Sequence, residues 1–467
     1  MASIAQIKTA LQPDSTDSMQ AIVARERLKS LMFRAWILAG IFFMALPGTL
    51  LGFSNLMAIS THHGLASLPA AWIQGHGHAQ VFGWIGSFIL GIGFYSQPSH
   101  GRSLVRIPLT CFVLWTSGVA MRWTASIYGW HWRLVFPISA GLELIAVLLF
   151  IFAASQHKLP ERAQGKRAKP RMELWMVSVL MGTAGLAALV IFNFVECVRL
   201  AVNGTLLAFP HALDQRYLVL LAWGFLVPVV WGFSARWLPT FLAISRPNAR
   251  TFRTALTLDL IGALFGVSGW TVAATILLAS SAVAIGLALH LTQRPHGPAK
   301  IQGIHPSFPS FIRLAYAWLV IAGSMSVWAA IADQHGGIWG ASRHALTVGF
   351  AATMVFAIGP RILPHFAGIC SIFSKRLMFM SLMLLQTGCT VRVLSEPLAY
   401  EGLLPFAWKT LPISGMLELS GVLVFAINIA LTFLLGRSAF AGNSSTERSL
   451  AKREPRARVQ SPVPEAP

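Results

Sequence analysis

The sequence predicts an all-α polytopic membrane protein: a bundle of about twelve transmembrane helices, arranged as three pseudo-symmetric units of four. Composition is the first reason, because 55% of the 467 residues are hydrophobic and 11% are charged, with a mean hydropathy of +0.64. Soluble domains carry roughly 25% charged residues. Apolar runs of membrane-spanning length are the second reason, and an internal repeat is the third.

Twelve apolar runs approach the ~20 residues that a membrane-spanning helix needs. Their centres lie near residues 46, 87, 114, 145, 186, 229, 261, 281, 323, 354, 385 and 424, and only Ser268-Gly-Trp270 separates the seventh from the eighth. We expect a cytoplasmic N-terminal segment (1–33), a twelve-helix membrane domain (34–436) and a basic tail (437–467). The tail is rich in Arg, Ser, Pro and Glu and should be disordered, because it can bury little apolar area.

Basic residues predict the orientation, because cytoplasmic loops retain Lys and Arg. With both termini inside, all but seven of the 36 basic residues fall on the inner side; the outer seven are Arg122, Arg133, Arg199, Arg216, Arg343, Arg392 and Lys409. We therefore expect a multi-pass membrane protein with both termini in the cytoplasm. The bias toward basic residues in the inner segments accounts for the net charge of +20, and these segments can be attracted to anionic membrane lipid. Nucleic acid is therefore not an expected partner.

Two distant stretches share one pattern. His78 and His344 are each followed directly by Ala, by Gly five residues later and by Pro twenty residues later. A second match aligns FPISAGLEL with LPISGMLEL and places Glu143 opposite Glu418. These matches pair the second apolar run with the tenth and the fourth with the twelfth, which predicts an internal duplication in units of four helices.

The middle unit should then be runs five to eight. Its segment Arg236-Trp-Leu-Pro239 matches Arg361-Ile-Leu-Pro364, but counting back twenty residues from Pro239 reaches Val219 and no histidine. The eighth run likewise contains no glutamate. We infer that the middle unit has the same scaffold without the polar groups.

His78 and His344 both lie where a span enters from the outer face, so we expect their imidazoles at similar depth. Equivalent positions in two pseudo-symmetric units can face each other across one pocket, which is the geometry of two axial ligands on one haem. The alternative is a pair of interfacial histidines that hydrogen-bond to neighbours or to water. The residues alone leave both interpretations open.

Other polar residues of the outer half also have more than one interpretation. Arg343, Arg122 and Arg133 could bind haem propionates or serve only as topological anchors. Glu143 and Glu418 are costly in apolar spans, and they could pass protons, ligate a metal or accept hydrogen bonds from these arginines.

The remaining ionisable groups give weaker predictions. Six further outer histidines could build a copper site, although scattered loop histidines are an ordinary finding; they are His62, His63, His76, His131, His211 and His335. His365 follows a repeat proline on the inner side, and twenty helical residues, ~30 Å, separate that end from His344. The four cysteines are expected to fill packing positions, and Asp259 is an isolated carboxylate in the seventh run.

Several motifs resemble the NnrS family. The specific part is the run Arg343-His-Ala-Leu-Thr-Val-Gly349, with Met354, Arg361, His365 and Gly368. His76-Gly-His78 followed by Phe82-Gly83 is similar to that family's His-x-His span, and Arg236-Trp-Leu-Pro239 to its Gly-Arg-x-x-Pro segment. The resemblance covers roughly residues 33–436, but Ala79-Gln80 stand where the family usually has Glu-Met, and Ala235 stands in place of its Gly.

NnrS proteins are membrane proteins that contain haem and copper and are associated with denitrification and nitric oxide resistance. The resemblance implies a protein of the bacterial cytoplasmic (inner) membrane that contains haem, with copper as a second candidate cofactor, nitric oxide as a candidate ligand and an electron donor of unknown identity. The candidate metal ligands are then His78, His344, His76 and His365. Haem-copper oxidase main subunits are similar in having twelve spans and haem-binding histidines on the second and tenth, but runs six and seven here contain no histidine for their copper site.

Four functions are compatible with these observations. The first is the handling of nitric oxide or electrons at haem iron. The second is a cofactor-free secondary transporter, in which Glu143, Glu418 and Asp259 line a pathway. The third is a membrane nitric oxide reductase. The fourth is a metal-trafficking or haem-delivery protein. The sequence indicates no catalytic residue by which these could be separated.

Overall fold

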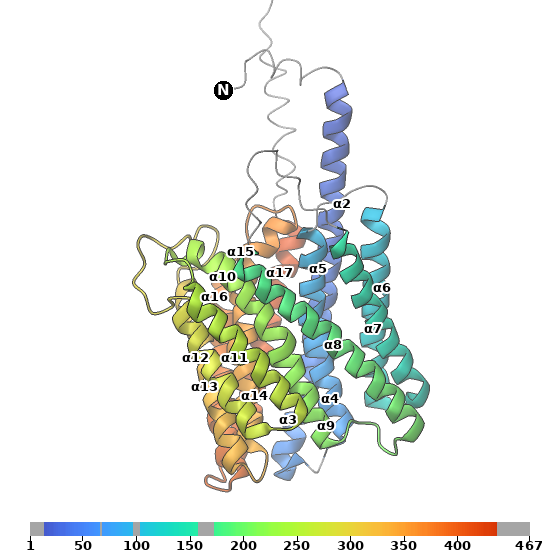
Figure 1. Ribbon diagram of the computed structural model, residues 1–467, viewed down its shortest axis with the longest axis vertical. Helices are drawn as coiled ribbons and strands as arrows, with labels where there is room; N and C mark the ends of the chain where they lie inside the picture. Colours follow the sequence, from blue (N-terminus) through green and yellow to red (C-terminus); the bar gives the residue numbers. More distant parts are fainter. Residues whose placement is uncertain (1–13, 66–67, 97–102, 157–171, 437–467) are drawn as a thin grey trace, which may run out of the picture.

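The computed structural model describes residues 14–65, 68–96, 103–156 and 172–436, and the regular structure in these ranges is helical (Figure 1). The helices join into twelve continuous spans, numbered 1 to 12 in chain order, one for each predicted apolar run. The prediction of an all-α bundle is confirmed.

Four spans contain a π-helical segment between two α-helices. Span 1 is α2 (Asp14–Phe43), η1 (Met44–Leu50) and α3 (Leu51–His62); span 2 is α4 (Ala70–His78), η3 (Ala79–Gly86) and α5 (Ser87–Ser96). Span 6 is α9 (His211–Val219), η4 (Leu220–Leu226) and α10 (Val227–Leu242); span 10 is α14 (Gly337–His344), η5 (Ala345–Ala352) and α15 (Thr353–Phe366).

The other eight spans are single α-helices. They are α6 (Ser103–Tyr128), α7 (Trp132–Ser155), α8 (Leu174–Asn203), α11 (Ala249–Ser268), α12 (Thr271–Ala288), α13 (Phe308–Ala332), α16 (Lys375–Tyr400) and α17 (Ala407–Leu435).

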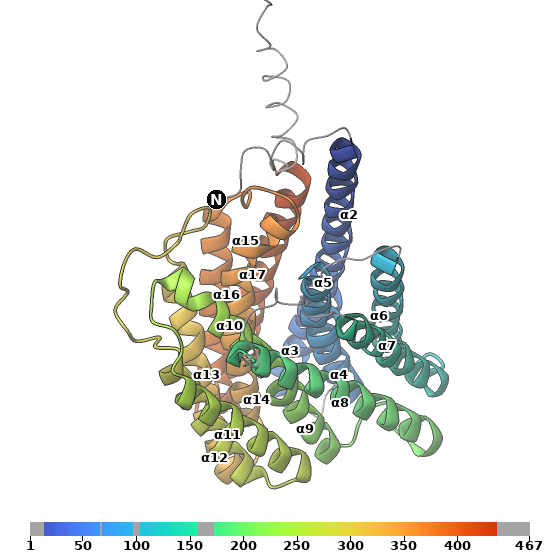
Figure 2. The same ribbon diagram turned by 45° about the horizontal axis from the view of Figure 1, so that its top comes forward.

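Consecutive spans pack against each other all the way around the bundle. Each span contacts the next one along the chain, and α17 closes the ring by packing against α3 and η1 of span 1. Both views place α6 and α7 on one side of the bundle and α11, α12 and α13 on the other (Figures 1 and 2). Because the order around the ring follows the order in the chain, the three groups of four spans occupy successive sectors, as the internal repeat predicts.

The π-helical segments mark the same place in all three units. η3 starts directly after His78, η4 directly after Val219, and η5 directly after His344. A π-helical turn is rare and often lies at a functional site. Its recurrence supports the threefold repeat and places Val219 where the other two units have histidine.

The outer surface of the bundle is suited to lipid. Within the described residues, ten spans are long and apolar enough to cross a membrane, and α6 and α11 are not among them. Large apolar side chains such as Leu46, Phe152 and Leu264 are exposed on the bundle, where a bilayer would cover them. The chain is therefore a multi-pass membrane protein.

The N-terminal helix is longer than a membrane crossing. α2 starts at Asp14 and extends beyond the other helices (Figure 1). The predicted boundary at residue 33 thus falls inside a continuous helix, whose candidate membrane span is Glu26–His62. Span 12 ends at Leu435, close to the predicted end of the membrane domain. Residues 1–13 and the predicted tail, 437–467, lie outside the described residues.

Candidate functional site

The first pair, His78 and Glu143, joins spans 2 and 4. His78 Nε2 lies 2.7 Å from Glu143 Oε1, and the two side chains are 5% and 1% exposed. The imidazole also stacks on Phe82, one turn further along span 2, at 4.4 Å between ring centroids. His78 ends α4 and Glu143 lies in α7, so the pair is held by two regular helices.

The second pair, His344 and Glu418, repeats this arrangement between spans 10 and 12. His344 Nε2 lies 2.6 Å from Glu418 Oε1, and the side chains are 22% and 11% exposed. His344 ends α14 as His78 ends α4. The sequence repeat that aligned both histidines and both glutamates therefore corresponds to one contact made twice.

Two glycines on the intervening spans make room for the glutamates. A Cβ atom on Gly118 of α6 would lie 2.8 Å from Glu143 Cγ, and one on Gly388 of α16 would lie 2.6 Å from Glu418 Cγ. In both cases the same Cβ would lie 2.9 Å from the backbone carbonyl four residues before the glutamate. Both distances are well below the ~3.5 Å at which carbon atoms pack, so either glycine allows a close approach that a side chain would prevent.

An arginine lies one helical turn beyond each of these glycines. Arg122 follows Gly118, and Arg392 follows Gly388, by four residues in the segments GVAMR and GCTVR. Residues four apart lie on one helix face, so each arginine belongs to the same side of its helix as the glutamate contact. This match was not predicted, although the shared Gly-x-x-x-Arg spacing is present in the sequence.

The second arginine has a carboxylate partner. Arg392 donates from Nε to Glu396 Oε2 at 3.0 Å and from Nη2 to Glu396 Oε1 at 2.9 Å. Glu396 is 4% exposed. In the first unit the residue four positions after Arg122 is Ser126, which is also buried. The two units therefore differ by one carboxylate at an equivalent position.

The first arginine has aromatic and thiol neighbours instead. Arg122 is 4% exposed, and its guanidinium lies 3.9 Å from the ring centroid of Phe136 and 5.1 Å from that of Phe209. Its Nη1 donates to Cys197 Sγ at 2.6 Å. Within the described ranges Arg122 forms no ion pair with a carboxylate.

A continuous polar chain connects the first pair to Arg122. Asn193 Nδ2 donates to Glu143 Oε2 at 3.1 Å, and Cys197 Sγ donates to Asn193 Oδ1 at 3.7 Å. Both linking residues lie in α8. The chain therefore runs from His78 through a carboxylate, an amide and a thiol to a buried guanidinium.

The middle unit keeps the packing and has apolar residues at the equivalent places. A Cβ atom on Gly262 of α11 would lie 2.9 Å from the Leu278 side chain, as one on Gly118 would contact Glu143. A Cβ on Gly266, four residues later, would lie 2.7 Å from Val219 Cγ1. Val219 and Leu278 thus replace the histidine and the glutamate.

Comparison with known families follows this geometry. A family model described as "Domain of unknown function (DUF8744)" matches residues 100–433. The chain belongs to the DUF8744 family. The matched region includes Glu143 and both members of the second pair, whereas His78 lies before it. No curated protein matches the chain.

The other predicted site residues of this DUF8744 protein have protein partners. His76 Nδ1 donates to the Gly48 carbonyl at 2.9 Å, and its ring fills the space that a Cβ on Gly52 would occupy. Arg343 donates to Gln215 Oε1. The exposed guanidinium of Arg133 donates from Nη2 to the Gly204 carbonyl oxygen at 3.1 Å and lies 5.2 Å from the ring of Trp132.

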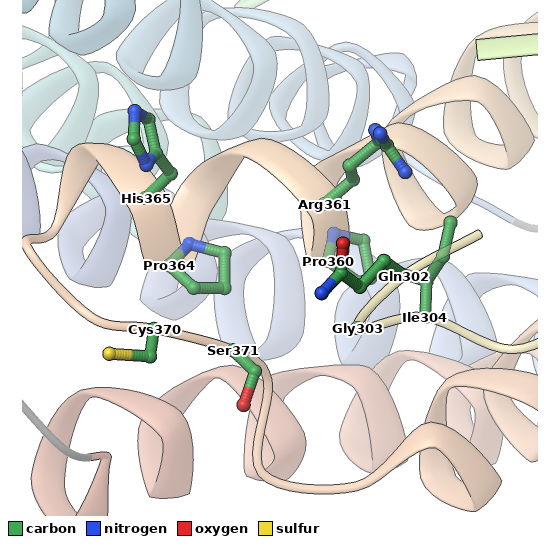
Figure 3. A pocket seen from close by; sticks show the side chains of 9 residues that line it. All are labelled: Gln302, Gly303, Ile304, Pro360, Arg361, Pro364, His365, Cys370 and Ser371. Atoms are coloured by element: carbon green, nitrogen blue, oxygen red, sulfur yellow. The ribbon is translucent and has the colours of Figure 1, made fainter. Parts of the chain in front are cut away.

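His365 lies apart from both pairs, beside a cavity of about 40 Å³ at the end of α15 (Figure 3). The cavity is lined by Gln302, Gly303, Ile304, Pro360, Arg361, Pro364, His365, Cys370 and Ser371. Figure 3 shows the His365 ring and the Cys370 thiol pointing in different directions. Among the described residues, no group of three or more His, Cys, Asp or Glu side chains is placed to hold a metal ion.

The described geometry does not fit a haem held between His78 and His344. An axial histidine gives one ring nitrogen to the iron, but each Nε2 lies within hydrogen-bond distance of its own glutamate. Positions 76 and 78 lie about 200° apart around a helix, and it is His76 that lies within electrostatic range of His344 and Glu418. Each histidine therefore forms a pair with its own glutamate, and a pocket shared by the two imidazoles stays a prediction.

Asp259 is a third buried carboxylate of the bundle. It is fully buried in α11, and neither carboxylate oxygen has a hydrogen-bond partner within the described residues. It lies in the middle unit, which has neither the histidine nor the glutamate. An ionised carboxylate in such a place is costly, so we expect Asp259 to be protonated.

Proposed function

We propose that the protein is a cofactor-free secondary transporter that carries protons on its two histidine–glutamate pairs. The observation that carries this proposal is the contact of an imidazole nitrogen with a carboxylate oxygen at 2.7 Å and 2.6 Å, made at equivalent positions of two units. Ionisable groups inside membrane spans commonly form proton relays. Internal repeats around a central site are typical of secondary transporters.

Each pair has the chemistry of a proton-binding site. Imidazole and carboxylate can each take up a proton, and a contact near 2.7 Å allows one proton to be held between them. Burial makes an isolated charge on either partner costly. A proton that enters or leaves a pair therefore changes its energy strongly, which is the property that a coupled carrier needs.

Proton flux into vesicles tests the proposal. The purified protein is reconstituted into liposomes that enclose a pH-sensitive dye, and a potassium diffusion potential drives proton entry. We expect flux above that of empty vesicles, and a decrease of roughly tenfold or more in Glu143→Gln and in Glu418→Gln. Equal flux in empty and protein-containing vesicles, or normal flux in both variants, contradicts the proposal.

The surface pair of His335 and Glu401 supplies a matched control. His335 Nδ1 lies 3.2 Å from Glu401 Oε2, but these side chains are 57% and 25% exposed. Glu401→Gln makes the same chemical change as the test variants in a more solvated pair. We expect it to leave the flux unchanged.

A haem-based role in nitric oxide tolerance is the second candidate, and it is supported by the resemblance to NnrS. It would require Glu143 and Glu418 to turn away from the imidazoles, so no step is derived through a haem. An optical spectrum of the purified protein separates the two candidates. For either function, the distribution of basic residues supports placing both termini in the cytoplasm, and the resemblance to NnrS supports a bacterial inner membrane.

A further inference from the structure

The repeated arginine has a carboxylate partner in the third unit and none in the first. Arg392 donates from Nε and Nη2 to the two carboxylate oxygens of Glu396, one turn later in α16. Arg122 lies at the equivalent position of α6, but the residue one turn later is Ser126. Within the described ranges Arg122 forms no ion pair. The third unit therefore shows how this arginine binds a carboxylate that the first unit does not supply.

The guanidinium of Arg122 keeps the same two nitrogens unused. Its Nη1 donates to Cys197 Sγ, whereas Nε and Nη2 donate to no atom of the described residues. The side chain is 4% exposed and lies against the rings of Phe136 and Phe209. Nε and Nη2 are one edge of the planar fork that matches a carboxylate, and a buried charge without a partner is costly. This edge is therefore available to an anion.

A phenol hydroxyl in the same region also has no partner. Tyr217 of α9 is 7% exposed, and its hydroxyl forms no hydrogen bond with the described residues. Its ring packs on that of Phe209, with centroids 5.6 Å apart, and Phe209 also lies against Arg122. The hydroxyl is within electrostatic range of Glu143, Arg122 and Cys197. Because a buried hydroxyl without a partner is costly, Tyr217 is a second donor suited to an anionic ligand.

Acidic neighbours limit the charge that a ligand of Arg122 can carry. Glu143 is joined to Arg122 by a chain of hydrogen bonds. Asp214 of α9 is within electrostatic range of Arg122, although Arg343 acts on it more strongly. Glu196 of α8 has its own arginine partner, 3.0 Å away. Because carboxylates repel a dianion such as phosphate more strongly than a monoanion, the site favours a ligand with one negative charge. The aromatic rings beside the guanidinium favour a small apolar body on that ligand.

We infer that Arg122 and Tyr217 bind the carboxylate of a small monocarboxylate, which the protein carries together with protons. Nε and Nη2 of Arg122 donate to the two ligand oxygens, as those of Arg392 donate to Glu396, and the Tyr217 hydroxyl donates to one of them. The inference rests on the proposed function and deepens it by naming the substrate class. Glu143 packs on α6 one turn before Arg122, so the ligand and the first proton-binding pair are neighbours.

Saturation-transfer NMR of the full-length protein in detergent micelles tests the site. The probes are acetate, propionate and acetamide, which is the neutral isostere of acetate, and empty micelles are the blank. We expect transfer to both carboxylates and roughly tenfold weaker binding of acetamide, because it lacks the charge. An equal concentration of inorganic phosphate should displace little of either carboxylate. Absence of transfer to both carboxylates, equal binding of acetamide, or displacement by phosphate overturns the inference.

Substitutions of the two donors locate the binding. Arg122→Gln removes the fork and should abolish the transfer to acetate. Tyr217→Phe removes only the hydroxyl and keeps the ring, and it should weaken acetate binding roughly tenfold. Arg216→Gln is the matched control, because Arg216 precedes Tyr217 in α9 and is exposed, and it should bind acetate as the parent does. Parent-like binding in Arg122→Gln or in Tyr217→Phe contradicts the inference.

The internal repeat suggests a substitution that should occupy the site with a side chain. Ser126→Glu places a carboxylate one turn after Arg122, as Glu396 follows Arg392. We expect this carboxylate to bind Nε and Nη2 and to weaken acetate binding roughly tenfold or more. Acetate binding at the parent affinity in folded Ser126→Glu argues against the site. If this buried position does not accept a glutamate, the variants of Arg122 and Tyr217 decide the question.

The binding experiment and the flux experiment fail independently. Acetate binding that depends on Arg122, with no proton flux into vesicles, would support the carboxylate site and reject the proposed transport. Proton flux with no binding of either carboxylate would support proton transport and reject the named substrate class. Both experiments use the same full-length protein.

Discussion

His78 and His344 are each the last residue of an α-helix that continues directly into a π-helical segment, and each lies within hydrogen-bond distance of a glutamate two spans later. The corresponding residue of the middle unit, Val219, also lies directly before a π-helical segment, but its side chain is apolar. The transition from α-helix to π-helix, and with it the helical scaffold, thus occurs in all three units, whereas the histidine–glutamate contact occurs in two of them.

Substitution of the glycines behind the glutamates should weaken the bundle at both pairs. A methyl group in Gly118→Ala or Gly388→Ala would meet the glutamate Cγ at 2.8 or 2.6 Å, and overpacking of this kind costs about 1–3 kcal/mol. We expect lower thermal unfolding temperatures in detergent and slower proton flux. Gly286→Ala is the control, because its Cβ would meet nothing within 4 Å; an equal effect in all three variants would contradict the role of the close contacts.

Loss of Arg392 should destabilise the protein more than loss of Arg392 and Glu396 together. Arg392→Gln leaves a buried carboxylate without its partner, which costs about 3–5 kcal/mol. The double variant Arg392→Gln with Glu396→Gln removes both charges and should recover much of that stability. Chemical unfolding of the single and double variants measures the coupling, and purely additive effects would show that the ion pair is unimportant.

Replacement of Asp259 by asparagine should preserve or raise stability. Its carboxylate has no hydrogen-bond partner in the described part of the bundle, and an unsatisfied polar group costs about 1–3 kcal/mol. We expect a free energy of unfolding at least equal to that of the parent. Asp214→Asn is the comparison, because Asp214 faces Arg343 and its change should be destabilising. A marked loss of stability in Asp259→Asn would indicate a partner for this carboxylate.

An optical spectrum of the purified protein distinguishes proton transport from haem chemistry. For protein expressed with ample haem, we expect no stoichiometric Soret band, because each Nε2 of the predicted axial pair faces a glutamate. Iron and copper counted by mass spectrometry complete the measurement. One haem per chain, lost or converted to high spin in both His78→Ala and His344→Ala, would contradict the transporter and support the NnrS-like function.

Much of the fold could be read from the sequence because lipid imposes length and polarity on each helix. Every predicted apolar run lies in one span, and the repeat of His78 and Glu143 by His344 and Glu418 identified the four residues that form the two contacts. The partner of each histidine was not predicted. Sequence position gives depth along a helix, but the face of the helix depends on packing and on the π-helical turn that follows.

The supporting residues were missed for a related reason. Gly118 and Gly388 have no side chain to suggest a role, and their importance becomes visible only when the glutamate of the next span lies against them. Arg122 was predicted as a possible partner of haem propionates or a topological anchor, and Arg392 only as one of the outer basic residues. Their shared spacing from the glycines in the printed sequence was the observation that could have placed them beside the two pairs.

The most direct test of the whole account is the distance between each histidine and its glutamate in the membrane. Dipolar NMR on protein labelled with nitrogen-15 at histidine and carbon-13 at glutamate measures the coupling of imidazole nitrogen to carboxylate carbon. We expect two buried couplings, one lost in Glu143→Gln and the other in Glu418→Gln, with each coupling independent of the other variant. Absence of both couplings, or loss of neither in these variants, would contradict the two pairs and the functions derived from them.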